Sequence, residues 1–231
     1  MDGILSWLKQ LEFGFLLDTA GIVLAALLSI TVHETCHGLV AFWLGDDTAK
    51  RQGRLSLNPL RHVDLMGLVL MALARFGWAK PVPIDARRFR KPKLGMVLTA
   101  LAGPVSNVLL AFFAMLVRAV WLAAVPFEQM GTLFHLVRSI LENIAVISAG
   151  LAVFNLFPIP PLDGSKVLFA VLPNRWYIQL MRYERYGMLL LMVLLLLNVL
   201  DVPLLFLRGA LLDGISAITE PVFYYIANWL V

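Results

Sequence analysis

Two histidines and a glutamate lie close together in an apolar part of the chain. They belong to the pentapeptide HETCH at residues 33–37, inside an apolar stretch from about residue 22 to residue 44. On a helix, positions i and i+4 share one face, so His33 and His37 could bind one metal ion, with Glu34 beside them as a general base. Ionisable groups at membrane depth are costly to bury and usually serve a function. The pattern therefore predicts a zinc hydrolase that works inside the bilayer.

The composition indicates a membrane protein. Of the 231 residues, 60% are hydrophobic and only 15% are charged, whereas a soluble domain is usually about 25% charged. Several segments of 18 or more residues are almost uncharged, which is typical of membrane spans. The net charge of +4 is gathered beside these segments, which fits membrane topology rather than nucleic-acid binding. We expect a single membrane-embedded domain over residues 1–231.

The apolar segments predict an all-α polytopic membrane protein with five or six membrane segments. The expected spans are residues 19–44, 94–125, 133–157 and 187–207, with 210–231 either a last span or an interfacial helix. A short interfacial helix is expected before residue 17. Residues 65–74 are too few to cross a core of about 30 Å, so they predict a re-entrant element.

Two short segments predict extended backbone. Residues 54–57 alternate in polarity, which predicts a short strand near the cytoplasmic face. Residues 77–83 contain two prolines and could offer an edge strand to a substrate.

The basic residues orient the chain. Fifteen of the 19 Lys and Arg fall within residues 50–61, 75–93 and 166–185. All three groups lie on one side if residues 65–74 dip into the membrane and return. The positive-inside rule then makes that side cytoplasmic. We expect a multi-pass protein of the cell or inner membrane, with its active site toward the cytoplasm.

A third metal ligand is expected at the depth of the histidine pair, because catalytic zinc sites generally use three protein ligands. At 1.5 Å per residue, His37 lies about 12 Å before the end of its helix near Gly45. Asp163 lies about 15 Å before the end of its own short helix near Leu172. The prolines at 158–161 interrupt the backbone just before Asp163. An alternative role for Asp163 is to cap that helix.

The two motifs together resemble the site-2 protease family of intramembrane zinc metalloproteases. That family pairs HExxH with a distal NxPxxDG-type motif, and here the distal motif reads NLFPIPPLDG at residues 155–164. The resemblance implies that His33, His37 and Asp163 bind one zinc ion and that Glu34 is the general base. It also implies that Asn155 lies near the site and hydrogen-bonds the developing oxyanion; a helix-end cap is its alternative role.

Three further stretches, residues 58–64, 77–83 and 103–107, look like the compact form of the family. The chain has no room for the PDZ domain that many relatives carry. The resemblance covers about residues 23–171, so we expect a catalytic core at 19–172 and additional membrane segments at 186–231. Within these stretches, His62 is either a fourth metal contact or a loop cap, and Gly103 and Asn107 indicate a helix-packing face.

These observations predict an endopeptidase that cleaves a peptide bond in or near a transmembrane segment of another membrane protein. Zinc would lower the pKa of a water molecule, and Glu34 would carry the proton. The alternatives are a non-catalytic membrane protein that binds or transports metal, an inactive protease-like scaffold, and a hydrolase that acts on lipid. The substrate and the oligomeric state do not follow from the sequence.

Overall fold

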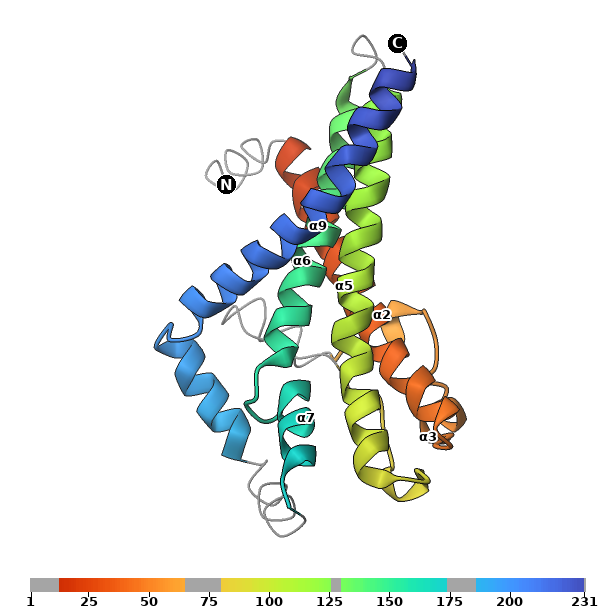
Figure 1. The fold of residues 1–231 in the computed structure, drawn as a ribbon, viewed down its shortest axis with the longest axis vertical. Helices are drawn as coiled ribbons and strands as arrows, with labels where there is room; N and C mark the ends of the chain where they lie inside the picture. The colour runs from red at the N-terminus through yellow and green to blue at the C-terminus, as the bar shows by residue number, and fades with distance from the viewer. Residues whose placement is uncertain (1–12, 65–79, 126–129, 174–185, 231) are drawn as a thin grey trace, which may run out of the picture.

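The computed structural model describes residues 13–64, 80–125, 130–173 and 186–230 (Figure 1). Four of its helices are long and apolar enough to cross a membrane, which confirms the expectation of an all-α, multi-span protein at that level. These helices are α2 (Phe13–Trp43), α5 (Pro92–Ala124), α6 (Thr132–Leu156) and α9 (Asp201–Leu230). The expected re-entrant element at 65–74 and most of the N-terminal segment lie outside the described residues, as do residues 77–79.

Helix α5 is the centre of the packing and contacts α2, α6, α7 and α9 (Figure 1). The contacts among α2, α5 and α6 are made largely by small side chains, which let helix backbones approach closely. Ser29 of α2 and Ser148 of α6 are both fully buried, and their hydroxyl oxygens are 2.8 Å apart. The buried alanines of this contact are Ala25, Ala111, Ala114, Ala145 and Ala149.

The third span breaks where the prolines predict it. Helix α6 ends at Leu156, and α7 (Asp163–Val171) begins after the proline-containing turn. A Cβ at Gly164 would lie 2.1 Å from the Leu156 carbonyl oxygen and 2.6 Å from that of Phe157. The absence of a side chain at this glycine therefore lets α7 start directly against the end of α6.

The span predicted at 187–207 is wrong. Within the described residues the preceding apolar helix runs over Tyr186–Leu196, and α9 begins only at Asp201, so residues 187–207 do not form one helix. Between them Asn198 has φ 55°, a left-handed conformation that ends a helix. Pro203 then lies in the first turn of α9, where a proline is tolerated. The candidate span is Asp201–Trp229, and it includes the stretch whose role the sequence left open.

The strand predicted at 54–57 is also wrong, since the described residues contain no strand. Instead, side chains use the backbone there. The Ser56 carbonyl accepts from Thr35 Oγ1 at 2.9 Å and lies 2.7 Å from His62 Nε2. Each buried backbone group needs one partner, and here side chains replace the neighbouring strand.

The α6–α7 corner should be intolerant of a side chain at Gly164. We expect Gly164→Ala to lower the free energy of unfolding by about 1–3 kcal/mol, the usual cost of overpacking. Denaturant titration in detergent micelles would measure it. Gly209→Ala is the matched control, because nothing lies within 4 Å of a Cβ there. Equal stability of the two variants would contradict this account of the corner.

Candidate metal centre

Three side chains from two helices converge on one point. Nε2 of His33 and Nε2 of His37 are 3.0 Å apart. Oδ2 of Asp163 lies 3.3 Å from the first of these atoms and 3.1 Å from the second. All three residues are buried, with at most 7% of their surface exposed. Within the described part of the chain, this is the cluster of His, Cys, Asp and Glu that could hold a metal ion.

The donor set fits zinc. Zinc binds imidazole nitrogen and carboxylate oxygen at about 2.0–2.2 Å, almost always with tetrahedral geometry. Ligand atoms on a tetrahedron with such bonds are about 3.3–3.6 Å apart. The three observed separations, 3.0, 3.1 and 3.3 Å, are at the lower end of this range or up to 0.3 Å below it. Three protein ligands would leave a fourth position for water or substrate.

The contacts of His37 call for a metal ion or a proton between its Nε2 and the Asp163 carboxylate. Its Nδ1 lies 2.6 Å from the backbone carbonyl oxygen of Thr99 on α5. A carbonyl can only accept, so this nitrogen carries the hydrogen. In the neutral ring Nε2 then presents a lone pair to Asp163 Oδ2, which is itself an acceptor when ionised. Two acceptors at this distance are stable together when a positive charge lies between them.

His33 has a corresponding partner on α5. Nδ1 of His33 lies 3.1 Å from the side-chain amide of Asn107, which is fully buried. With a metal on Nε2, Nδ1 carries a hydrogen, so the amide must turn its oxygen toward the ring. The Asn107 oxygen has no other hydrogen-bond partner among the described residues. This amide orientation therefore satisfies both groups.

Gly103 forms the back wall of the site. A Cβ there would lie 2.5 Å from His33 Cε1 and 2.5 Å from His37 Nε2. The sequence placed Gly103 and Asn107 on a helix-packing face, and the structure shows that the helix they pack against carries the histidine pair. Thr99, Gly103 and Asn107 follow one another at intervals of four residues, which puts all three on one face of α5. That spacing was the available signal, but it does not reveal the partner helix.

Glu34 lies at the edge of the cluster and is held by backbone. Its Oε2 accepts from the Val82 N–H at 2.9 Å. The segment that carries this donor is fixed in turn by Arg54, whose side chain is buried. Arg54 donates to the carbonyls of Lys80 at 2.6 Å and Pro81 at 3.1 Å. One oxygen of Glu34 is thus anchored, and the carboxylate lines the cavity beside the histidines.

The second oxygen of Asp163 is also occupied. Lys166, one turn further along α7, places its Nζ 3.2 Å from Asp163 Oδ1. Oδ2 is the oxygen that faces the two imidazoles. The lysine therefore favours a carboxylate that offers a metal one oxygen rather than two. Lys166 was not among the site residues predicted from the sequence.

Two other residues raised by the sequence have different surroundings. Asn155 lines the cavity, but its Nδ2 donates to the Leu151 carbonyl at 2.9 Å. His62 is fully buried next to Ser56 and is not in the metal cluster. It ends the short 3-10 helix Pro59–Arg61, so it is a loop cap.

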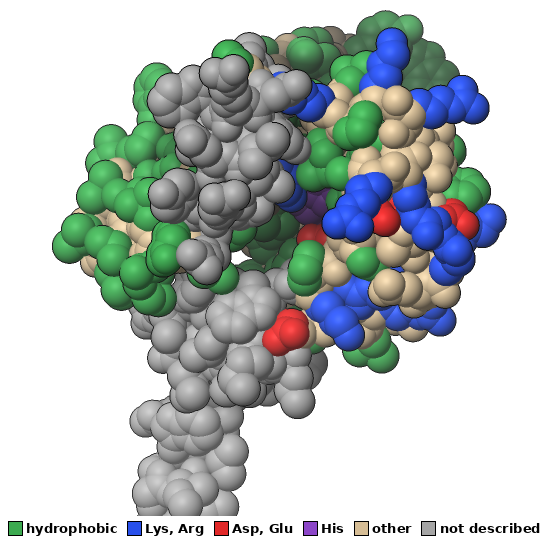
Figure 2. Space-filling view, turned by 90° about the horizontal axis from the view of Figure 1, so that it is seen from below, with side chains coloured by type: hydrophobic (Ala, Val, Ile, Leu, Met, Phe, Trp, Pro, Cys, Tyr) green, Lys and Arg blue, Asp and Glu red, His purple; other side chains and the backbone are tan. Residues whose placement is uncertain are grey.

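The cavity at the metal cluster is small. Its volume is about 150 Å³, enough for water and a few peptide atoms. Pro81, Val82 and Ile84 form one wall, and Met96, Thr99 and Ala100 of α5 form another. Figure 2, seen from the end where α7 and the loops lie, shows Lys and Arg side chains gathered near a hollow in which histidine is visible.

Comparison with known proteins assigns the chain to a family. The model of Peptidase family M50 matches residues 21–199. The chain is 39% identical to "Putative zinc metalloprotease YwhC" of Bacillus subtilis over 75% of this chain and 78% of that protein. It is 30% identical to "Putative zinc metalloprotease Rip2" of Mycolicibacterium smegmatis over 76% of this chain and 66% of that protein. No solved structure matches the chain.

Loss of the Asn107 amide should weaken zinc binding. In Asn107→Leu the Nδ1–H of His33 loses its acceptor, and we expect zinc affinity to fall about 10- to 100-fold, as for other partners of metal-binding histidines. Asn107→Asp keeps an oxygen in place and should bind zinc at least as well as wild type. Competition with a fluorescent chelator measures both. Wild-type affinity in Asn107→Leu would show that the amide only packs.

A methyl group at Gly103 should displace the histidine rings. We expect Gly103→Ala to retain less than a tenth of the wild-type zinc after purification, because its Cβ overlaps both imidazoles. Metal analysis of the detergent-purified protein provides the measurement. Gly150→Ala is the control, since its Cβ would make only an ordinary contact of 3.7 Å. Full zinc content in Gly103→Ala would be inconsistent with the described back wall.

Proposed function

The chain belongs to Peptidase family M50, the site-2 protease family, and we propose that it cleaves a peptide bond in or near a transmembrane segment of another membrane protein. It is an intramembrane zinc metalloprotease. The observation that carries the proposal is the convergence of His33, His37 and Asp163 at 3.0–3.3 Å with the Glu34 carboxylate beside them. These three residues are the proposed ligands of one zinc ion.

Glu34 is the proposed proton carrier. A bound zinc supplies Lewis acidity, which activates water for attack and polarises the substrate carbonyl. Glu34 Oε2 is engaged by the Val82 N–H, so Oε1 is the atom we assign to take the proton from water. The same oxygen would then give the proton to the leaving amine. The backbone hydrogen bond keeps the carboxylate oriented through both transfers.

Asn155 is the proposed oxyanion donor. One of its two amide hydrogens goes to Leu151 at 2.9 Å, which leaves the other for the cavity that it lines. A donor preoriented toward developing charge stabilises a transition state more than a ground state. The bond to Leu151 would hold the amide in that orientation. The helix-end role and the catalytic role of Asn155 are therefore compatible.

The substrate must enter as an unwound chain. A helix with its side chains is about 10–12 Å wide, which is too wide for a cavity of about 150 Å³. The extended wall at residues 80–83 has few free N–H groups: Lys80 donates to His62, Val82 donates to Glu34, and 81 and 83 are prolines. The carbonyls of Lys80 and Pro81 already accept from Arg54. We propose that a substrate strand here donates to the carbonyls of Val82 and Pro83, with residues 77–79 outside the described structure.

We propose that the site opens toward the cytoplasm. The loops at the α7 end of the molecule, residues 44–64 and 80–91, contain nine of the 19 Lys and Arg. Positive charge of this density beside membrane spans favours the cytoplasmic side. The metal cluster lies nearer this end of α2, because His37 is about 9 Å along the helix from Trp43. The core at 19–172 would then present its cavity to that side.

Glu34→Gln separates catalysis from metal binding. Glutamine keeps an oxygen for the Val82 N–H but cannot take a proton, so we expect zinc content to be unchanged and cleavage to fall about 10²- to 10⁴-fold. Purified wild type and variant would be incubated in proteoliposomes with a panel of single-span membrane proteins. His37→Ala is the metal-free control. Equal cleavage by wild type and Glu34→Gln would refute the assigned role.

A further inference from the structure

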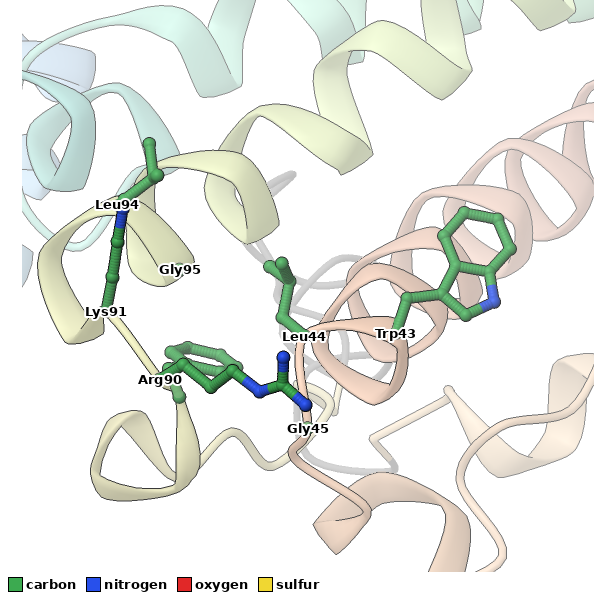
Figure 3. A pocket seen from close by; sticks show the side chains of 8 residues that line it. Trp43, Leu44, Gly45, Arg90, Lys91, Leu94 and Gly95 are labelled. Atoms are coloured by element: carbon green, nitrogen blue, oxygen red, sulfur yellow. The ribbon is translucent and has the colours of Figure 1, made fainter.

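A second and larger pocket lies away from the metal cluster. It has a volume of about 350 Å³ and lies between the end of α2 and the start of α5 (Figure 3). Trp43, Leu44 and Gly45 line it from one side, and Arg90, Lys91 and Leu94 line it from the other. The volume is within the range of about 300–1,000 Å³ usual for small-molecule sites. Nothing in the proposed peptidase mechanism uses this pocket.

The pocket contains two positive charges that lack counter-ions. Arg90 and Lys91 are exposed and make no ion pair with any described residue. The neighbouring Arg88, by contrast, is 2.5 Å from Asp47 and also approaches Asp46 and Asp85. The acidic side chains of this loop are therefore directed to Arg88 and not to the pocket. Arg90 extends toward Leu44 and Gly45, and Lys91 extends toward Leu94 (Figure 3). Two uncompensated cations that line one concave site favour an anionic ligand.

Phe89 also lines the pocket, and its side chain is held in a fixed position. Its ring is 4% exposed, and a Cβ at Gly95 would lie 2.5 Å from that ring. The glycine thus lets Phe89 pack directly against the first turns of α5. This packing fixes the two residues that follow it at the mouth of the pocket.

The pocket lies at the level of lipid headgroups. Trp43 is the last residue of the candidate span Leu17–Trp43 and is 70% exposed, as is usual for tryptophan at a membrane–water interface. Pro92 begins the candidate span that contains Leu94, which is 50% exposed. The cations therefore lie where apolar helix surface gives way to loops. A ligand here would meet charge on one side and acyl chains on the other.

We propose that this pocket binds the phosphate headgroup of an anionic phospholipid from the adjoining leaflet. The Arg90 guanidinium, which reaches across the pocket toward Gly45, can donate two parallel hydrogen bonds to phosphate oxygens. Lys91 extends toward Leu94 instead and adds positive charge at the edge of the pocket. Basic pockets between transmembrane helices are suited to such headgroups. Leu44 and Leu94 favour a lipid over free phosphate, since these two lining residues offer apolar surface to the glycerol and the acyl chains.

A lipid bound there would join the two helices that form the metal site. The pocket spans from α2 to α5, and the same two helices are joined by the hydrogen bond between His37 and Thr99. Trp43 is about 9 Å along α2 from His37, and Gly95 is about 6 Å along α5 from Thr99. The bound headgroup would therefore stabilise the helix spacing on which that hydrogen bond depends.

The test uses the full-length protein in nanodiscs of phosphatidylcholine alone or with 30 mol% phosphatidylglycerol. We expect the anionic lipid to raise the thermal unfolding midpoint by several degrees and to be retained in native mass spectra. The double variant Arg90→Gln/Lys91→Gln should lose both effects. Arg87→Gln/Lys50→Gln is the control for charge, because it removes two exposed charges that do not line the pocket. Lys50 also lies 4.5 Å from the Phe42 ring, so each variant is compared with itself in the two lipid mixtures. The control should gain as much stability from phosphatidylglycerol as wild type does.

Three outcomes would overturn the proposal. Equal stabilisation of the pocket variant and the control variant by phosphatidylglycerol would show a general charge effect. Equal stabilisation of wild type by glycerol 3-phosphate at matched ionic strength would show that the ligand is a free phosphate compound. Absence of retained lipid from wild type, together with an unchanged midpoint, would show that the pocket does not bind lipid.

Discussion

The site depends on the close approach of three electron-pair donors, which only a metal ion or a proton between them can stabilise. His37 directs its Nδ1 hydrogen to Thr99, and the Asp163 carboxylate can only accept, yet the donor atoms lie 3.0–3.3 Å apart. Without a cation such atoms repel, so contacts elsewhere must hold their helices together. The Ser29–Ser148 contact and the tight corner at Gly164 do this.

Helix α5 complements the histidine pair in three ways along one face. Thr99 contributes a backbone carbonyl, Gly103 contributes space, and Asn107 contributes an amide. Each addresses a different part of the imidazoles: one Nδ1, the metal side of both rings, and the other Nδ1. Both rings are thereby held in position before any metal binds, and the Thr99 carbonyl also keeps the hydrogen of His37 on Nδ1. This lowers the cost of assembling the site.

The residues predicted from sequence to bind metal do come together, because the prediction needed only helix geometry. A spacing of four fixes the histidine pair, and counting residues to the helix ends matches Asp163 in depth. The break near Asn198 was missed because a hydropathy profile does not detect a single residue in a left-handed conformation. The strand was wrong because alternation over four residues is too short a signal. The contact of Asn107 with His33 could not be predicted, since the sequence of one helix does not determine which residues of another helix it faces.

Two of the contacts that hold the site come from backbone groups, the Thr99 carbonyl and the Val82 N–H. Any amino acid except proline supplies the Val82 donor, and every amino acid supplies the Thr99 acceptor. Alanine substitution at either position would therefore leave these two hydrogen bonds in place and would report only on the packing of the side chain. A comparison of side chains alone would therefore miss the part of this centre that the backbone provides.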